Sequence, residues 1–216
     1  MSLQLYFAPL ACSLATRISL YEVGAPAADT RFTQVDTRAK RLPDGGDFFA
    51  VNPMGQVPVL RTDSGELLTE NPVVLQYVAD QKPESGLAPR GGMERYRIQQ
   101  WLNFITSELH KVVFVPLLDP AMPDAGKGYA RQKAEQRLAY LNSELEGREF
   151  LLDRFTVADA YLTTVLNWAK YTGIELAKWP AVKSYMDRMY QRPSVVKALA
   201  EETKAYQEQE ARRTSR

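Results

Sequence analysis

The sequence predicts a small α+β domain with a mixed sheet, followed by an all-helical domain, and three observations lead to this prediction. Over residues 1–82, short apolar runs of strand length alternate with segments of helical periodicity. Residues 83–90 then break both patterns with prolines and a glycine. Residues 91–216 show helical periodicity alone. We therefore expect two domains joined by a linker at 83–90, and a chain of 216 residues is long enough for both.

The first domain begins as strand, helix, strand. An apolar run at 3–7 reads as a strand, and 13–23 reads as a helix that Gly24 ends. The segment 31–35 reads as the second strand. Because no hairpin turn separates the two strands, they should be parallel neighbours joined by a right-handed crossover.

The rest of this domain reads as a loop, a hairpin and a helix. Strands at 57–61 and 66–68 flank a Thr-Asp-Ser-Gly turn, and a helix follows over 72–81. The order β-α-β, loop, β-β-α is that of a thioredoxin-like domain. Within the loop, Phe48 and Phe49 form an apolar pair that either packs against the sheet or meets a partner chain.

A long helix opens the second domain, and apolar residues at spacings of three and four mark its core face. On an α-helix, Asn103, Ser107 and His110 fall on a neighbouring face, within about 60° of one another. That polar line belongs either to a site or to an ordinary solvated face. Further along, Thr156 and Asp159 have the spacing of a capping box, which predicts a structural role. The expected helices are 93–118, 127–146, 157–172, 180–191 and 194–209.

Composition excludes several classes of function. With 27 basic and 26 acidic residues, the net charge of +1 does not favour nucleic acid or an anionic membrane as a partner. One cysteine and one histidine are too few for a disulfide, a Cys-X-X-Cys redox pair or a metal site rich in these residues. We find no Gly-rich nucleotide loop, no leader and no long apolar run, so we expect neither a nucleotide cofactor nor a membrane. The expected location is the reducing cytoplasm.

Cys12 stands where the first strand gives way to the first helix. The positive end of a helix dipole favours an ionised thiol at such a place, which makes Cys12 a candidate for chemistry. A small buried cysteine without a role is the alternative.

Two further positions indicate a ligand site. Pro58 opens a strand expected inside the sheet, where its missing amide hydrogen requires a reason, and a cis Val57-Pro58 bond would supply one by turning the Val57 backbone outward. Asn71 and Pro72 suit the start of a helix, but a helix start does not need Glu70. A carboxylate beside exposed helix-start amides can clamp the ammonium and carboxylate of an amino-acid head group.

Five motifs occur in order along the chain: Pro9 to Leu14, Asn52 to Pro58, Leu68 to Glu70, Glu108 to Lys111, and Phe155 to Leu162. This ordered set resembles the cytosolic glutathione transferases, specifically the bacterial beta class. The resemblance covers the chain from about Leu3 to Leu199. It implies the glutathione transferase fold, a cis proline at Pro58, glutathione as co-substrate and a homodimer.

The resemblance also implies a role for each candidate residue. Cys12 would face the glutathione sulfur and form a mixed disulfide with it, with His110 near the thiol as the second candidate catalytic residue. Val57 would pair with the cysteinyl part, and Lys40 would bind the glycyl carboxylate. The γ-glutamyl head would be held by Glu70 and Asn71, and the helical domain would close the site with Asn103, Ser107 and His110.

The implied activity is addition of the glutathione thiol to apolar electrophiles, as in detoxification, or thiol–disulfide exchange at Cys12, with a peroxidase as a variant. A non-catalytic binding or interaction protein of the same fold is the alternative. Three positions depart from the class: Leu10 replaces a usual glycine, Asn71 a serine or glycine, and Met54 a lysine. The charged tail 207–216 extends past the usual end and is expected to fray. The expected apolar walls of the electrophile pocket are Leu10, Val113, Phe114 and Leu117.

Overall fold

The computed structural model describes residues 3–24 and 29–214, and the contacts divide the chain into two compact units. One unit comprises Met1–Leu87 together with Pro193–Arg216, and the other comprises Ala88–Arg192. The boundary drawn from the sequence assigns the last helix, α9 (Pro193–Thr214), to the helical domain, whereas its contacts group it with the sheet. No helix within the described ranges is both long enough and apolar enough to cross a membrane.

The first unit contains a four-stranded mixed sheet with the order β2-β1-β3-β4. Strand β1 (Gln4–Phe7) pairs in parallel with β2 (Arg31–Gln34) and antiparallel with β3 (Val59–Arg61). Strand β4 (Leu67–Leu68) closes the hairpin with β3. The predicted α+β, thioredoxin-like architecture is therefore confirmed.

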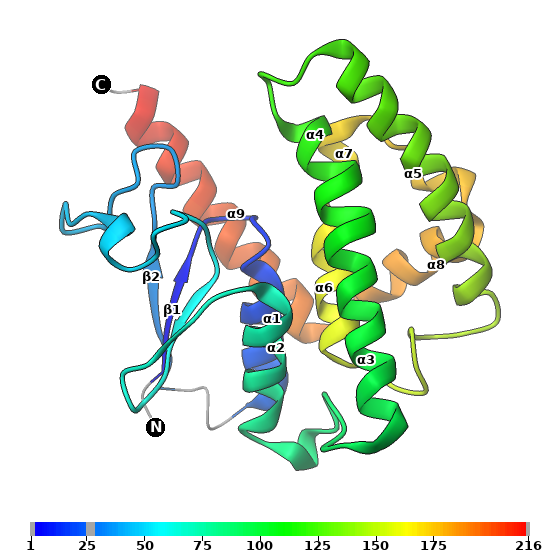
Figure 1. Ribbon diagram of the computed structural model, residues 1–216, viewed down its shortest axis with the longest axis horizontal. Helices are drawn as coiled ribbons and strands as arrows, with labels where there is room; N and C mark the ends of the chain where they lie inside the picture. The colour runs from blue at the N-terminus through cyan, green and yellow to red at the C-terminus, as the bar shows by residue number, and fades with distance from the viewer. Residues whose placement is uncertain (1–2, 25–28, 215–216) are drawn as a thin grey trace. The chain divides into compact units, whose positions relative to one another are not determined.

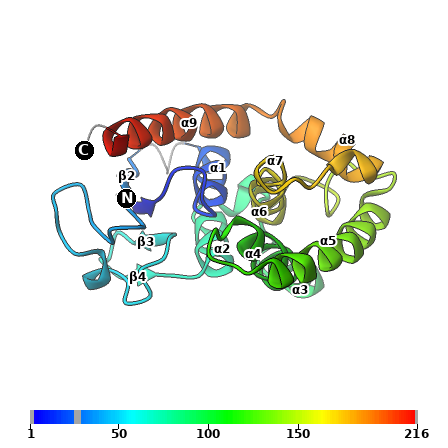
Figure 2. The same ribbon diagram turned by 90° about the horizontal axis from the view of Figure 1, so that it is seen from above.

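The two faces of this sheet are covered differently. Helices α1 (Leu14–Val23) and α2 (Asn71–Asp80) pack together on one side, as Figures 1 and 2 show. On the other side, Tyr6 and Val59 form a core with Phe48, which lies in the short 3₁₀ helix η2 (Phe48–Ala50).

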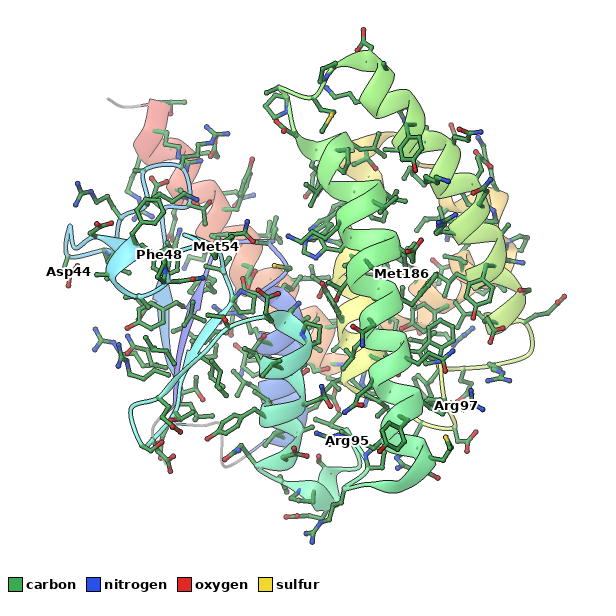
Figure 3. The ribbon with its side chains drawn as sticks, in the orientation of Figure 1. Asp44, Phe48, Met54, Arg95, Arg97 and Met186 are labelled. Carbon is green, nitrogen blue, oxygen red and sulfur yellow. The ribbon has the colours of Figure 1, made fainter. Side chains whose placement is uncertain are left out.

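Of the predicted apolar pair in the loop, Phe48 is fully buried in this core (Figure 3). Phe49 keeps 46% of its surface exposed. Because Phe48 packs beside Tyr6 in the core, only Phe49 of this pair remains available to a partner.

The second unit is all helical, as predicted. A second 3₁₀ turn, η3 (Pro83–Ser85), precedes it at the linker. Its elements are α3 (Gly92–Phe104), the π-helix η4 (Ile105–Phe114), α4 (Val115–Leu118), α5 (Asp124–Leu145), α6 (Val157–Leu166), α7 (Ala169–Thr172), the 3₁₀ helix η5 (Leu176–Lys178) and α8 (Pro180–Met189).

The long helix expected over 93–118 has a π-helical middle, which changes the angular spacing on which the predicted polar line was based. A π-helix bonds from residue i to i+5, so its side chains do not follow the 100° spacing of an α-helix. His110 is buried, whereas Asn103 and Ser107 are exposed. Pro116 lies just after the π segment. Proline has no amide hydrogen, and its ring clashes with the carbonyl four residues earlier, so the α-helical hydrogen bond cannot form there.

The Thr156–Asp159 capping box is confirmed at the start of α6. The Thr156 amide and hydroxyl both donate to Asp159 Oδ2, at 2.9 and 3.0 Å. Asp159 is fully buried, and its other oxygen accepts hydrogen bonds from the Leu151 amide and the Tyr185 hydroxyl. The role is structural, as the spacing indicates.

Replacing Thr156 with alanine removes one donor to the buried Asp159 carboxylate. We expect the free energy of unfolding to fall by about 1 kcal/mol, the usual size of a lost helix cap. Urea unfolding followed by circular dichroism measures the change. Thr156→Ser keeps the hydroxyl and should lose less than half as much, and equal losses in the two variants would contradict a role for the hydroxyl.

Candidate functional site

Cys12 lies in the turn between β1 and α1, directly before Ser13, which occupies the N-cap position of α1. Its thiol donates to the Val57 carbonyl oxygen, with 3.1 Å between the sulfur and the oxygen. The Val57-Pro58 peptide bond is cis, as predicted. The first unit thus brings together the candidate thiol and the backbone of Val57, two residues that are 45 positions apart.

Asn71 ties the start of α2 to the same turn. Its side-chain amide donates to the Cys12 carbonyl oxygen at 3.0 Å, and its side-chain oxygen accepts from the Thr16 hydroxyl at 3.3 Å. Since Asn71 is buried and both of its polar atoms are engaged, its side chain positions the cysteine turn. Its backbone amide is the first of α2, where intrahelical acceptors are absent. The exposed Glu70 directly precedes it.

Lys40 is held in place by Gly55. The Lys40 ammonium donates to the Gly55 carbonyl oxygen at 2.8 Å. A Cβ atom added to Gly55 would lie 3.1 Å from Lys40 Cδ and 2.8 Å from Phe49 Cε1. Gly55 also has a φ of +61°, so only glycine meets both conditions without strain. The lysine stem therefore lies directly over a glycine in the Asn52–Pro58 motif.

Backbone strain is concentrated at this part of the fold. Within residues 3–24 and 29–214, the non-glycine residues with positive φ are Leu10, Lys40 and Glu70, at +59°, +55° and +63°. Such a backbone costs a side-chain-bearing residue about 1–2 kcal/mol. Two of the three are predicted glutathione ligands, and the third lies two residues before Cys12. Strained positions cluster at functional sites, so this independent signal coincides with the sequence-based prediction.

A buried ion pair anchors the cysteine turn to α9. Arg17, on α1, donates from Nε to Glu202 Oε1 at 2.8 Å, and the Leu10 amide donates to Glu202 Oε2 at 2.8 Å. The Arg17 guanidinium also lies over the rings of Phe7 and Phe32, 4.4 and 4.0 Å from their centres. Burial raises the pKa of Glu202 to about 7, although Arg17 and the Leu10 amide act in the opposite direction.

Sequence reasoning missed this pair, because 185 residues separate Arg17 from Glu202. An arginine within the apolar side of the predicted helix 13–23 is the one signal that could have indicated a buried partner.

In the second unit, His110 is buried against aromatic rings. A hydrogen bond of 2.7 Å joins its Nδ1 to the Tyr161 hydroxyl, and its ring centre lies 4.9 Å from that of Trp168. Burial, with a smaller contribution from the Lys111 charge, lowers the pKa of His110 from 6.5 to about 4. His110 is therefore neutral near neutral pH. Tyr161, which orients it, was not predicted from the sequence.

The other two residues of the predicted polar line bond within their own helix. The Asn103 side-chain amide donates to the Gln99 carbonyl oxygen at 2.8 Å, and the Ser107 hydroxyl donates to the Asn103 carbonyl oxygen at 3.0 Å. Both side chains are exposed and can exchange these bonds for others.

Comparison with known protein families identifies the family of the chain. Residues 11–81 match the N-terminal domain of glutathione S-transferases, and residues 105–193 match the C-terminal domain. The chain belongs to the glutathione S-transferase family. The transferase is 44% identical over 202 residues to glutathione S-transferase GstA of Escherichia coli O157:H7. The matched region covers 93% of this chain and 98% of GstA.

Solved structures agree with this assignment. A sphingomonad glutathione S-transferase complexed with glutathione matches with a TM-score of 0.87 and 46% identity, over 93% of this chain and 98% of its own. The beta-class transferase of Sphingomonas chungbukensis matches with a TM-score of 0.87 and 44% identity, over 92% and 98%. The transferase is thus of the bacterial beta class, it is an enzyme, and glutathione is its co-substrate.

The strain at Leu10 gives a stability prediction for this transferase. Leu10→Gly removes the strain at φ +59°, whereas Leu10→Ala keeps it, so the glycine variant should be more stable by about 1 kcal/mol. Urea unfolding of both variants measures the difference. Leu67, in β4, is a matched control: there alanine should be the more stable replacement, because glycine weakens a strand. An alanine variant at Leu10 as stable as the glycine variant would contradict the strain.

The single histidine makes the pKa of His110 directly measurable. The proton NMR signal of its imidazole should keep its neutral position down to about pH 5 and move with a midpoint near 4. Between the unfolded pKa of about 6.5 and the folded value, only the unfolded chain takes up this proton, so His110 makes the fold less stable as the pH falls. Lys111→Met should raise the midpoint slightly. A midpoint near 6.5 would show that the ring is hydrated.

Proposed function

We propose that this transferase joins the thiol of glutathione to apolar electrophiles and that Cys12 forms a reversible mixed disulfide with glutathione. The contact between the Cys12 thiol and the Val57 carbonyl carries this proposal, because it holds the protein sulfur beside a backbone edge that can pair with a peptide. A tripeptide that pairs with Val57 through its cysteinyl residue presents its own sulfur to Cys12.

Residues on either side of this edge suit the two ends of glutathione. The carboxylate of Glu70 faces solvent, where it can hold the γ-glutamyl ammonium, and the first amide of α2, on Asn71, can hold the adjoining carboxylate. At the other end, Lys40 can bind the glycyl carboxylate by exchanging the Gly55 carbonyl for a charged acceptor. The strained backbone at Lys40 and Glu70 supports ligand roles for both residues.

We further propose that Asn103, Ser107 and His110 also bind glutathione. The lowered pKa of His110 limits its part in the chemistry. A neutral imidazole can exchange a hydrogen bond or accept a proton, but it cannot serve as a standing positive charge beside a thiolate. Tyr161 holds Nδ1, which leaves Nε2 as the ring nitrogen for a ligand.

The two chemistries use the same bound glutathione. In conjugation, the glutathione thiolate forms a bond to the electrophile, and the leaving group departs with the displaced electron pair. In exchange, the Cys12 thiolate attacks one sulfur of glutathione disulfide, forms the mixed disulfide and releases the other glutathione as a thiolate. The thiolate of a second glutathione then attacks the glutathione sulfur of the mixed disulfide, forms glutathione disulfide and releases the Cys12 thiolate.

The electrophile is proposed to be small and apolar. Of the four expected pocket walls, Val113 and Phe114 are fully buried, whereas Leu10 and Leu117 are partly exposed. Leu10 therefore combines an apolar side chain, a strained backbone and proximity to Cys12, and it is the residue that we expect to shape substrate choice most. We also propose a homodimer, for which Phe49 offers an exposed aromatic ring, and a cytoplasmic location suited to a lone cysteine.

Intact mass measurement tests the mixed disulfide. After exposure to glutathione disulfide, the protein should gain the mass of one glutathione, and a reductant should remove it. Because Cys12 is the only cysteine, the adduct can form nowhere else as a disulfide. Cys12→Ala should gain nothing, and an unmodified wild-type protein would overturn the exchange reaction.

A substrate panel run on wild type and Cys12→Ala then separates conjugation from exchange. Disulfide substrates should be turned over only by the wild type, since the variant lacks the protein sulfur. A chlorinated nitroaromatic acceptor reports conjugation in both proteins. Loss of conjugation in the variant would assign that reaction to Cys12 as well, and full retention would assign it to His110 or to backbone donors.

A further inference from the structure

The C-terminal end of α9 forms one wall of a cavity of about 520 Å³ in the first unit. Gln34 and Asp36 contribute from β2 and the residues directly after it, Arg41 and Leu42 from the following loop, and Arg212 and Arg213 from α9. This volume lies in the range of small-molecule sites. The cavity is lined by none of the residues proposed to bind glutathione.

The wall on α9 is ordered, although the sequence predicts that this tail frays. The helix continues to Thr214, so the prediction is wrong for 207–214, and 215–216 lie outside the described residues. Arg213 donates to Asp36 Oδ1 at 3.1 Å, and the Gln34 side-chain amide donates to Gln209 Oε1 at 3.3 Å. These side-chain bonds over more than 170 residues hold the helix end against β2 and its loop, so that the cavity has two fixed sides.

The charges around the cavity do not balance. Asp36 is the one acidic residue in its lining, and it is engaged by Arg213 and by the amides of Arg38 and Ala39. Asp44, at the tip of the loop, points outward in Figure 3 and binds the Gly46 amide. Two guanidinium groups remain, those of Arg41 and Arg212.

Among the residues that the structure describes, neither of these guanidinium groups has an anionic partner. Over the ranges that the structure describes, the Arg41 side chain makes a single hydrogen bond, to the Gly45 carbonyl oxygen at 3.3 Å, and the Arg212 side chain makes none. The last turn of a helix favours cations, which accounts for Arg212 and Arg213. It does not account for Arg41, which lines the same cavity from the loop after β2.

We propose that this cavity is a second binding site, which takes a small organic dianion with one acidic group on Arg41 and the other on Arg212. The planar guanidinium fork suits carboxylate and phosphate groups equally, because both offer two oxygens to parallel N–H donors. The side-chain amides of Gln34 and Gln209 can bind polar atoms between the two acidic groups, and Leu42 lies against the carbon chain. The proposal does not rest on the glutathione site.

Isothermal titration calorimetry of the full chain with succinate, at constant ionic strength, tests the site, and glycerol 3-phosphate, which carries a single acidic group, is the comparison probe. Succinate should bind saturably with a stoichiometry of one and more tightly than glycerol 3-phosphate, because only succinate has an acidic group for each arginine. The double variant Arg41→Gln, Arg212→Gln should weaken that binding at least tenfold. Both side chains are exposed, and circular dichroism checks that the fold persists.

Two control variants locate the binding. Arg61→Gln is matched to Arg41→Gln, because Arg61 also bonds a glycine carbonyl four residues ahead but lies outside the cavity. Lys40→Gln removes the charge proposed to bind glutathione. Both should leave the affinity within twofold of wild type. Absence of saturable binding, loss of affinity in either control, or unchanged affinity in the double variant would overturn the proposal without bearing on glutathione.

Discussion

The buried Glu202 carboxylate imposes the constraint on which the first unit depends. A charge removed from water must be paired and hydrogen-bonded, and here the partners are the Arg17 guanidinium and the Leu10 amide. Arg17 is itself buried between aromatic rings of β1 and β2. One carboxylate therefore connects the sheet, α1, α9 and the turn that carries Cys12. Removing Arg17 would raise the pKa of Glu202 further, because Arg17 is the charged partner that opposes the effect of burial.

The geometry of the site comes from turns more than from regular elements. Leu10, Lys40 and Glu70 each occupy the left-handed backbone region that glycine usually fills, and each stands directly before a helix or within a loop. At Lys40 and Glu70 the side chain supplies the charge, so glycine is not an alternative. At Leu10 no such reason exists in the chemistry of glutathione. The side chain of Leu10 is therefore the feature that most distinguishes the cysteine turn of this transferase from the glycine usual in its class.

Periodicity and turn chemistry predicted most of the fold, because these signals are local. The parallel pairing of β1 with β2, the β3–β4 hairpin, the capping box at Thr156 and the neighbourhood of Cys12 and Val57 follow from short motifs. The π-helix did not, since apolar spacings of three and four are compatible with either helix until the fold buries one face, and His110 consequently faces Tyr161. Glu202 and the ordered end of α9 were also missed, because their partners lie more than 170 residues away. What sequence reasoning lacked was long-range pairing of charges.

The 192-residue separation between Leu10 and Glu202 also sets an order of events during synthesis. The ribosome delivers the cysteine turn long before its anchor, and domains otherwise fold as they emerge. The nascent thioredoxin-like segment can form its sheet early, but its reactive turn stays unanchored until α9 has left the ribosome. The protein therefore gains an anchored thiol only after this long-range contact has formed.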